Sequence, residues 1–191
     1  QMRWANPENY KAGRGAGGQA NFGRKGSACR GALEAGETWT LAEDAGMGTV
    51  RRLWITTSDR GAEMLRGLVI RMYWDGADKP AVEAPLGDLF GNPLGRAVVF
   101  ANAWFNNPEG RNWNCTLPMP FRRGFKITVT NETPKRCDMF WYHIDYSLGD
   151  KHGVRIVRDT VTSIDADQRM LALAGGQSLR YDRLIVSPGV D

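Results

Sequence analysis

The sequence predicts an all-β protein, a β-sandwich of the jelly-roll type with a C-terminal extension resembling a β-hairpin. Many short segments alternate apolar and polar residues, turn signals recur about every ten residues, and helical periodicity is almost absent. Such a pattern is typical of two antiparallel sheets packed face to face. A change of character near residue 150 divides the chain into a sandwich domain, 1–149, and a β segment, 150–191.

Residues 1–31 are rich in glycine and asparagine, and we expect them to form a loop over the sheet. Residues 4–10 show no strand pattern. Four glycines lie between positions 13 and 18, but no strand precedes them and no helix follows, as a phosphate-binding glycine loop requires. Asn6, Glu8 and Asn9 are candidates for polar contacts with a ligand. The alternative is a segment that merely covers the sheet.

The first strands follow from alternation. Residues 38–41 predict a short strand. In residues 49–57, Leu53 and Ile55 point to one face, whereas Arg52, Trp54 and Thr56 point to the other. We expect one helical turn within residues 59–67, and then a half-buried strand over 68–75.

Residues 74–91 contain acidic residues, several glycines and a tryptophan near the predicted strand ends. Sheet proteins often have their binding sites at strand ends. The pair Asp75-Gly76 predicts a turn. Residues 81–84 predict a short extended piece that ends before Pro85, and 85–88 predict a second turn.

The later strands are clearer. Residues 97–105 are apolar and favour β structure, and a loop follows over 106–110. Residues 125–130 alternate most regularly. Residues 139–146 carry large aromatic side chains on both faces, so we expect this strand inside its sheet rather than at an edge.

Composition excludes several function classes. Hydrophobic residues make up 42% and charged residues 24% of the 191 residues, as in ordinary globular proteins. The net charge of +4 is dispersed, so we expect no nucleic-acid partner. No apolar run approaches the roughly 20 residues that span a membrane, so no membrane partner is expected. The sequence does not distinguish cytoplasmic, periplasmic and secreted locations.

Cysteine and histidine usage predicts no metal site. Cys29, Cys115 and Cys137 are widely spaced and odd in number, and only His143 and His152 are present. We therefore expect free, mostly buried cysteines and no cofactor.

Three stretches carry a family resemblance. They are, in chain order, Ala5-Asn6-Pro7-Glu8-Asn9 with the following glycines and Arg24-Lys25-Gly26; then Trp74-Asp75-Gly76 with Pro80-Ala81-Val82-Glu83-Ala84-Pro85-Leu86-Gly87-Asp88-Leu89-Phe90-Gly91; then Leu117-Pro118-Met119-Pro120-Phe121-Arg122. Over about residues 3–149, this succession resembles glycoside hydrolase family 172, long catalogued as a domain of unknown function.

The resemblance implies two jelly rolls in tandem, of which this chain supplies the first. It also implies action on α-D-fructofuranosyl or α-D-arabinofuranosyl linkages by a two-glutamate retaining mechanism, in a homo-oligomer (a trimer or hexamer). The implied partner is a furanoside oligosaccharide. The family's glutamates lie in its second half, near a Thr-Glu-Asp run that does not occur here. We therefore assign no catalytic residue and expect the chain to be inactive alone.

Five further residues are candidates for shaping a sugar site. Trp74, Trp104 and Trp113 can stack on sugar rings. The alternative is that they pack in the core, which is the more common position for tryptophan. Asp75 and Asp88 can accept hydrogen bonds from hydroxyls. Both neighbour glycine, so the alternative is that each holds a turn through its own backbone contacts.

The segment after residue 150 is of another kind. Residues 154–157 predict a strand, 161–173 a hairpin turning at 165–167, and Gly175-Gly176 a turn leading to the stretch 181–189, in which 184–189 match an apolar strand and its glycine turn. Residues 151–191 resemble FAD-dependent pyridine-nucleotide-disulfide-type oxidoreductases, most closely the flavoprotein subunit of sulfide dehydrogenases. Pro188 and Gly189 are the FAD-like remnant. The GxGxxG fingerprint that binds the pyrophosphate is missing, so no FAD site is predicted.

Three functions remain as hypotheses: a glycosidase-type domain without its catalytic half, a non-catalytic carbohydrate-binding or assembly module, and a flavin oxidoreductase fragment. Jelly rolls serve several of these purposes, so the fold alone does not choose among them. The abrupt change at residue 150 is also compatible with two joined gene fragments or with an unrelated β extension.

Overall fold

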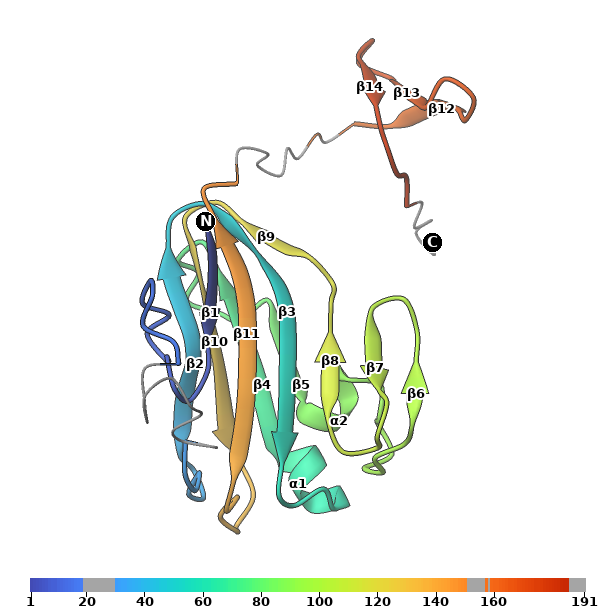
Figure 1. Ribbon diagram of the computed structural model, residues 1–191. Helices are drawn as coiled ribbons and strands as arrows, with labels where there is room; N and C mark the ends of the chain where they lie inside the picture. Colours follow the sequence, from blue (N-terminus) through green and yellow to red (C-terminus); the bar gives the residue numbers. More distant parts are fainter. Residues whose placement is uncertain (19–29, 151–156, 158, 186–191) are drawn as a thin grey trace. The chain divides into compact units, whose positions relative to one another are not determined.

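The computed structural model describes residues 1–18, 30–150, 157 and 159–185 (Figure 1). Two compact units divide the chain, Gln1–Val154 and Arg155–Asp191, and each is described by itself. The sequence stretches Arg24-Lys25-Gly26, Cys29, His152, 154–156 and Pro188-Gly189 lie outside the described residues.

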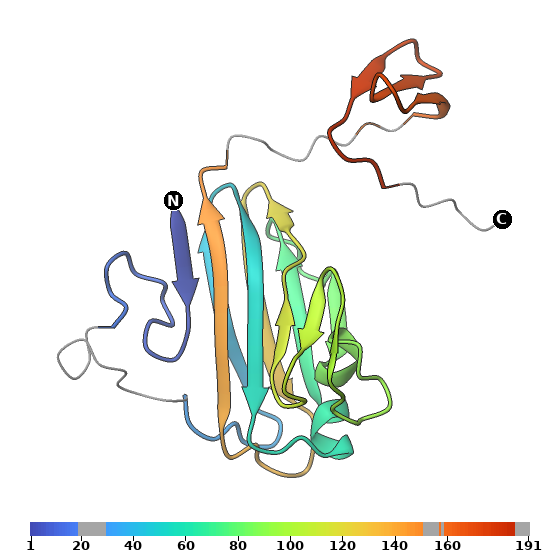
Figure 2. The same ribbon diagram turned by 45° about the vertical axis from the view of Figure 1, so that its right-hand side comes forward.

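The first unit is a sandwich of two antiparallel sheets (Figures 1 and 2). The larger sheet has the order β1 (Met2–Ala5), β11 (Phe140–Leu148), β3 (Gly48–Thr57), β8 (Trp113–Cys115), β7 (Phe105–Asn107), β6 (Phe100–Ala101), with β9 (Met119–Phe121) also paired to β3. The smaller sheet has the order β2 (Thr38–Ala45), β10 (Gly124–Asn131), β4 (Leu68–Trp74), β5 (Val82–Pro85). Two short helices, α1 (Ala62–Gly67) and α2 (Leu86–Leu89), precede β4 and follow β5.

The strand order is that of a jelly roll. Counted along the chain, the eight main strands are β1, β2, β3, β4, β5, β8, β10 and β11. The first, eighth, third and sixth form one sheet, and the second, seventh, fourth and fifth form the other. This alternation between two sheets is the double Greek key of the jelly roll. The predicted fold class is confirmed.

The core follows from alternation in the paired strands. In β3, Leu53 and Ile55 are fully buried while Arg52, Trp54 and Thr56 are half-buried on the outward side, as predicted. Strand β11 lies between β1 and β3, which confirms its predicted interior position. Phe125 packs at 4.9 Å between ring centroids against both Phe121 and Tyr146. Aromatic contacts of this kind add to the apolar area that the two sheets bury.

A β-bulge at Arg51 lets β3 keep its apolar residues inward. Asp145 pairs with Arg52 but Tyr146 pairs with Val50, so Arg51 has no opposite residue in β11. An extra residue of this kind restores alternation after a break in the pattern. Both Val50 and Leu53 are fully buried, although three positions separate them.

The bulge places Arg51 beside the end of the sandwich, where Asp150 gathers three donors. The Asp150 carboxylate accepts hydrogen bonds from Thr49 Oγ1 (2.5 Å), Ser147 Oγ (2.7 Å) and Arg51 Nη2 (3.0 Å). The Thr49 and Ser147 hydroxyls, with the Arg51 charge, lower the pKa of Asp150. Residue 150 is thus bound to the sheet at its last described position before the second unit.

Five sequence predictions need correction. Residues 2–5 form a strand, because they pair with β11; four residues with only Ala5 buried are too few to show alternation. β2 extends to Ala45, beyond the predicted end. Residues 86–89 form a helical turn rather than a simple turn. The stretch 97–105 contains only β6 and the first residue of β7, because Asn102 accepts hydrogen bonds from the backbone N–H groups of Trp104 and Phe105 and turns the chain. The loop predicted over 106–110 begins after Asn107, where β7 ends.

The second unit is a three-stranded antiparallel sheet of β12 (Val161–Asp165), β13 (Met170–Leu173) and β14 (Ser178–Arg180). The hairpin over 161–173 and the turn at Gly175-Gly176 are confirmed. Residues 181–185 are not in a strand, and the rest of the stretch 184–189 lies outside the described residues. The tight turn, with Gly176 N–H bonded to Leu173 O at 2.9 Å, brings residues 178–180 directly beside β13 instead.

Among the described residues, no helix is long and apolar enough to cross a membrane.

Gly48 tests the close packing where β3, β9 and β11 meet. A Cβ at this position would clash with the backbone oxygen of Ser147 and lie 2.7 Å from the Phe121 ring. We expect Gly48→Ala to lower the free energy of unfolding by about 1–3 kcal/mol in urea titrations, because neither neighbour can move freely. Gly61→Ala is the control, since its nearest neighbour is the flexible Asp59 carboxylate. Equal stability of the two variants would contradict the packing described.

Candidate functional site

The outward side of the larger sheet carries two tryptophans in its centre. Trp54 on β3 lies opposite His143 on β11, and Thr56 lies opposite Trp141. The two tryptophans therefore occupy diagonal positions of the two paired strands on one face, and such positions lie about 7–8 Å apart. Both are half-buried, so part of each ring is open to solvent. We call this surface the tryptophan face.

A hollow of about 350 Å³ lies between these rings and the loops beside them. Its other lining residues are Thr56, Arg60, Glu109, Arg111 and Asn112. Glu109 Oε2 accepts hydrogen bonds from Arg111 Nε (2.7 Å) and Asn112 Nδ2 (3.3 Å). The hollow thus combines aromatic rings with polar groups, the composition that ligand sites usually have.

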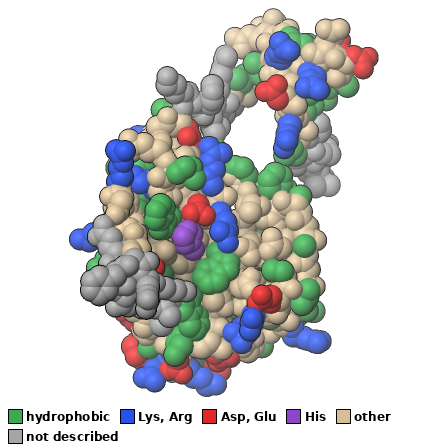
Figure 3. All heavy atoms as spheres, viewed as in Figure 1, with side chains coloured by type: hydrophobic (Ala, Val, Ile, Leu, Met, Phe, Trp, Pro, Cys, Tyr) green, Lys and Arg blue, Asp and Glu red, His purple; other side chains and the backbone are tan. Residues whose placement is uncertain are grey.

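A line of polar contacts crosses the same face. Asn6 Nδ2 contacts His143 Nδ1 at 3.3 Å, and His143 Nε2 contacts Asp145 Oδ1 at 2.9 Å. Asp145 lies 3.7 Å from Arg52 Nη1, and Arg52 Nη2 donates to Asn114 Oδ1 at 3.1 Å. In Figure 3 the histidine lies beside acidic, basic and hydrophobic side chains near the middle of this face.

The geometry around Asn6 assigns the proton on His143. Asn6 Oδ1 accepts hydrogen bonds from the N–H groups of Glu8 and Asn9, at 3.0 and 2.9 Å. Its amide nitrogen must then be the atom that donates to His143 Nδ1. The neutral imidazole therefore carries its proton on Nε2 and donates it to Asp145. Both ring nitrogens are occupied, so His143 fixes neighbours in place.

Asn6 and Asn9 hold the first loop together. Asn9 is buried, donates to Trp4 O and Gly13 O, and accepts from the Gly13 N–H at 2.9 Å. Side-chain contacts of this kind stabilise turns. Asn6 also contacts the tryptophan face through His143. Glu8 lies in the turn between Asn6 and Asn9, and its backbone N–H donates to Asn6 Oδ1.

Asp75 lies in a turn at the end of β4. Asp75 and Gly76 have φ angles of 58° and 80°, and Ala77 N–H bonds to Trp74 O at 3.0 Å, which is a type I′ turn. The Asp75 carboxylate accepts from the N–H groups of Arg122 and Arg123, each at 2.7 Å. Desolvation raises the pKa of Asp75, but these backbone N–H groups outweigh it and lower the pKa overall.

The other candidate residues are dispersed. Trp74 packs at the core margin, 6.5 Å from the Phe125 ring. Asp88 in α2 pairs with Arg66 at 2.5 Å. Trp113 is fully buried and offers no ring face to a ligand, whereas Trp104 is 39% exposed. The structure therefore brings Asn6 alone among the predicted residues into contact with the tryptophan face.

Trp54 and Trp141 were not among the predicted site residues, but the sequence held a signal for Trp54. It alternates with Leu53 and Ile55 and shares its face with Arg52 and Thr56. Its indole was therefore predictable as an outward side chain in the middle of a strand, where it can stack on a ligand. Trp141 lacked such a signal, because β11 carries aromatic residues on both faces.

The described residues hold no group of three or more His, Cys, Asp and Glu side chains arranged for a metal ion. Cys115 and Cys137 are free and buried, and desolvation raises the pKa of each thiol.

The strand order defines the first unit as a jelly-roll β-sandwich domain, and its larger sheet carries the tryptophan face on the outward side. One protein-family model, described as the GH172 first beta-sandwich domain, matches residues 10–156. The chain therefore belongs to glycoside hydrolase family 172, which confirms the predicted family; Ala5-Asn6-Pro7-Glu8-Asn9 lies before the matched range. The flavoprotein resemblance of the last residues stays a prediction.

The role of Asp75 in the turn leads to a test of stability. Asp75→Ala should lower the free energy of unfolding by about 0.5–1.5 kcal/mol, because the backbone N–H groups of Arg122 and Arg123 lose their carboxylate acceptor. Asp75→Asn should lose less, since it keeps one acceptor and tolerates a positive φ.

The same carboxylate gives a pH dependence. Because folding lowers the pKa of Asp75, its contribution is complete above the unfolded pKa and disappears as pH falls through the folded one. The stability difference between the parent chain and Asp75→Asn, measured by urea titration from neutral to acid pH, should therefore shrink at low pH. A difference independent of pH would contradict this role.

Proposed function

We propose that the tryptophan face binds carbohydrate and that this domain recognises the glycan in a family that hydrolyses glycosidic linkages. The observation that carries the proposal is the position of Trp54 and Trp141 on one outward face, beside a hollow lined with polar groups. Indoles in such a position suit the apolar C–H faces of sugar rings.

The hollow suits a polyhydroxyl ligand. Glu109 orients Arg111 and Asn112, so their remaining N–H groups can donate to sugar hydroxyls in a fixed direction. Thr56 Oγ1 donates to the backbone oxygen of Arg111, which holds this loop against β3. Such pre-organised donors reduce the entropy that binding costs.

Recognition rather than bond cleavage fits the carboxylates of this face. A retaining glycosidase needs two carboxyl groups about 5–5.5 Å apart, one of them protonated. Asp145 contacts His143 and lies near Arg52, and Glu109 pairs with Arg111. These contacts orient both carboxyl groups toward arginine and histidine side chains rather than toward each other, which does not suit an acid–nucleophile pair.

The finer parts of the proposal rest on the family resemblance. The substrate class is an α-D-fructofuranosyl or α-D-arabinofuranosyl oligosaccharide, cleaved by two glutamates in a retaining mechanism, in a homo-oligomer that is a trimer or hexamer. We place neither glutamate on this chain, since the Thr-Glu-Asp run does not occur in its sequence.

An assembly role is the second candidate. Leu94 is 85% exposed and Val99 69% exposed, both just before the outer strand β6. Exposed apolar side chains beside a strand edge favour protein contacts. Sedimentation velocity of Leu94→Ser and Val99→Ser variants tests this role, which predicts dissociation of any oligomer that the parent chain forms.

Sugar binding is tested by substitution of the two indoles. We expect Trp54→Ala and Trp141→Ala each to raise the Kd for an α-1,5-linked arabinotetraose about tenfold, because each removes a stacking surface. Titration calorimetry measures this change. Trp104→Ala is the matched control, since Trp104 is exposed elsewhere and should leave the Kd unchanged. Equal losses in all three variants would argue against the tryptophan face.

Hydrolysis gives a separate prediction. We expect the 191-residue chain to release no sugar from aryl α-D-arabinofuranosides or α-D-fructofuranosyl disaccharides, because the carboxyl groups of the tryptophan face, Asp145 and Glu109, pair with neighbouring side chains and not with each other. Chromatography of long incubations provides the measurement. Turnover that survives purification and disappears in Glu109→Gln would place the acid on this face and contradict our assignment.

A further inference from the structure

A second groove lies on the outward side of the smaller sheet, on the layer of the sandwich away from the tryptophan face. It has a volume of about 560 Å³. Thr38, Arg71, Tyr73, Lys126, Thr128 and Thr130 line it, together with the loop after β4. These residues come from three adjacent strands, β2, β10 and β4, at outward positions of the alternating pattern.

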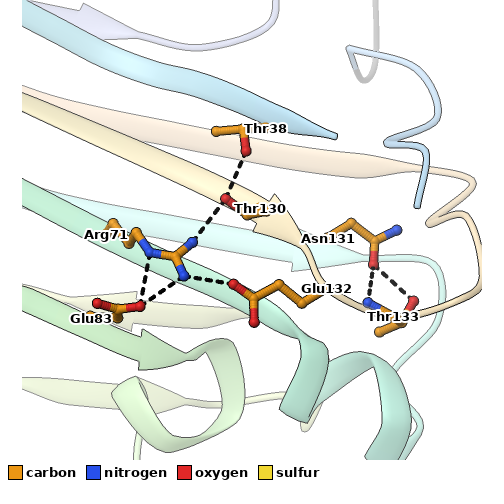
Figure 4. A network of polar contacts seen from close by, with 7 residues as sticks. All are labelled: Thr38, Arg71, Glu83, Thr130, Asn131, Glu132 and Thr133. Atoms are coloured by element: carbon orange, nitrogen blue, oxygen red, sulfur yellow. Dashed lines mark hydrogen bonds and ion pairs between the residues drawn. The ribbon is translucent and has the colours of Figure 1, made fainter. Parts of the chain in front are cut away.

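Arg71 is held rigidly at the edge of this groove (Figure 4). Its Nε and Nη2 donate to Glu83 Oε1 at 3.0 and 2.8 Å, and Nη2 also donates to Glu132 Oε1 at 2.6 Å. Its Nη1 donates to Thr130 Oγ1 at 3.0 Å. The hydrogen bonds that Arg71 donates, first to Glu132 and then to Glu83, raise the pKa of the guanidinium and outweigh desolvation, so the group stays charged.

A row of hydroxyls continues from this guanidinium. Thr130 Oγ1 lies 2.9 Å from Thr38 Oγ1 (Figure 4). The Thr130 hydroxyl oxygen accepts a hydrogen bond from Arg71, so its O–H can donate to the Thr38 hydroxyl. Thr38 is exposed, and its own O–H can donate to a ligand. Aligned groups of this kind reinforce each other's polarity. They offer both donors and acceptors in the groove.

The charges around the groove favour a neutral ligand. The positive charge of Arg71 is already shared by the carboxylates of Glu83 and Glu132, and Asp78 adds another carboxylate to the lining. Lys126 is the remaining cation among the lining residues. An anionic ligand would meet the Asp78 carboxylate and an Arg71 charge already paired by two glutamates, which leaves Lys126 to attract it and disfavours its binding.

We propose that this groove is a second carbohydrate-binding site that takes a neutral oligosaccharide. The half-buried ring of Tyr73 supplies the stacking surface, and Lys126, its direct cross-strand neighbour, supplies a donor beside it. Thr38 and Thr130 bind hydroxyls at the other end. Arg71 positions Thr130, and its two glutamates hold it there. This site is independent of the tryptophan face.

NMR titration of the ¹⁵N-labelled full chain tests the site. The probes are α-1,5-linked arabinotetraose and cellotetraose, which are neutral, and tetragalacturonate, which is anionic. We expect a neutral probe to shift amides of β4 and β10 around Tyr73 and Lys126. Tyr73→Ala should raise the Kd measured from these shifts about tenfold, and Thr38→Ala about threefold. Near-UV circular dichroism verifies that both variants fold.

Trp54→Ala is the control that separates the two sites, and it should change this Kd less than about twofold. If the groove binds while the tryptophan face does not, the proposed function fails and this inference stands. No shift with either neutral probe at about 20 mM would overturn it. So would binding of tetragalacturonate alone, shifts lost in Trp54→Ala, or shifts produced by protein dilution alone, which would indicate contact between two copies of the chain.

Discussion

The antiparallel pairing of β3 with β11 is the constraint on which the rest of the sandwich depends. It joins ten residues of one strand to nine of the other in the middle of the larger sheet. Period-two alternation then decides which side chains enter the core and which face solvent. β3 has one residue more than β11 in this pairing. The bulge at Arg51 takes up the extra residue and keeps Val50 and Tyr146 inward.

The proposed function rests on the residues that this pairing directs outward. The register that buries Leu53 and Ile144 also places Trp54 beside His143, and Trp141 beside Thr56. The polar line from Asn6 to Asn114 then ties the N-terminal strand to three further strands on the same face. Membership in a glycoside hydrolase family gives this aromatic and polar surface its proposed purpose. The aromatic rings of both proposed sites lie on regular strands, which hold side chains more precisely than loops do.

Sequence reasoning succeeded where alternation was long and regular. Strand β10 and the Asp75-Gly76 turn were predictable, because each depends on local pattern or φ preference. Strand β1 was not, since pairing with β11, far away in the chain, creates it. For the site, three-residue strands gave no means of choosing a face, so the buried position of Trp113 could not be foreseen. The face of Trp54, in a ten-residue strand, was predictable.

The most direct measurement of the central claim is the shift of the tryptophan indole N–H resonances on addition of a furanosyl tetrasaccharide. Each indole reports its own surroundings, so one titration compares exposed and buried rings in the folded chain. We predict that the Trp54 and Trp141 resonances shift together with one Kd, while the buried Trp39 and Trp113 stay in place. Shifts confined to other indoles, or none at all at saturating sugar, would contradict carbohydrate recognition by the tryptophan face.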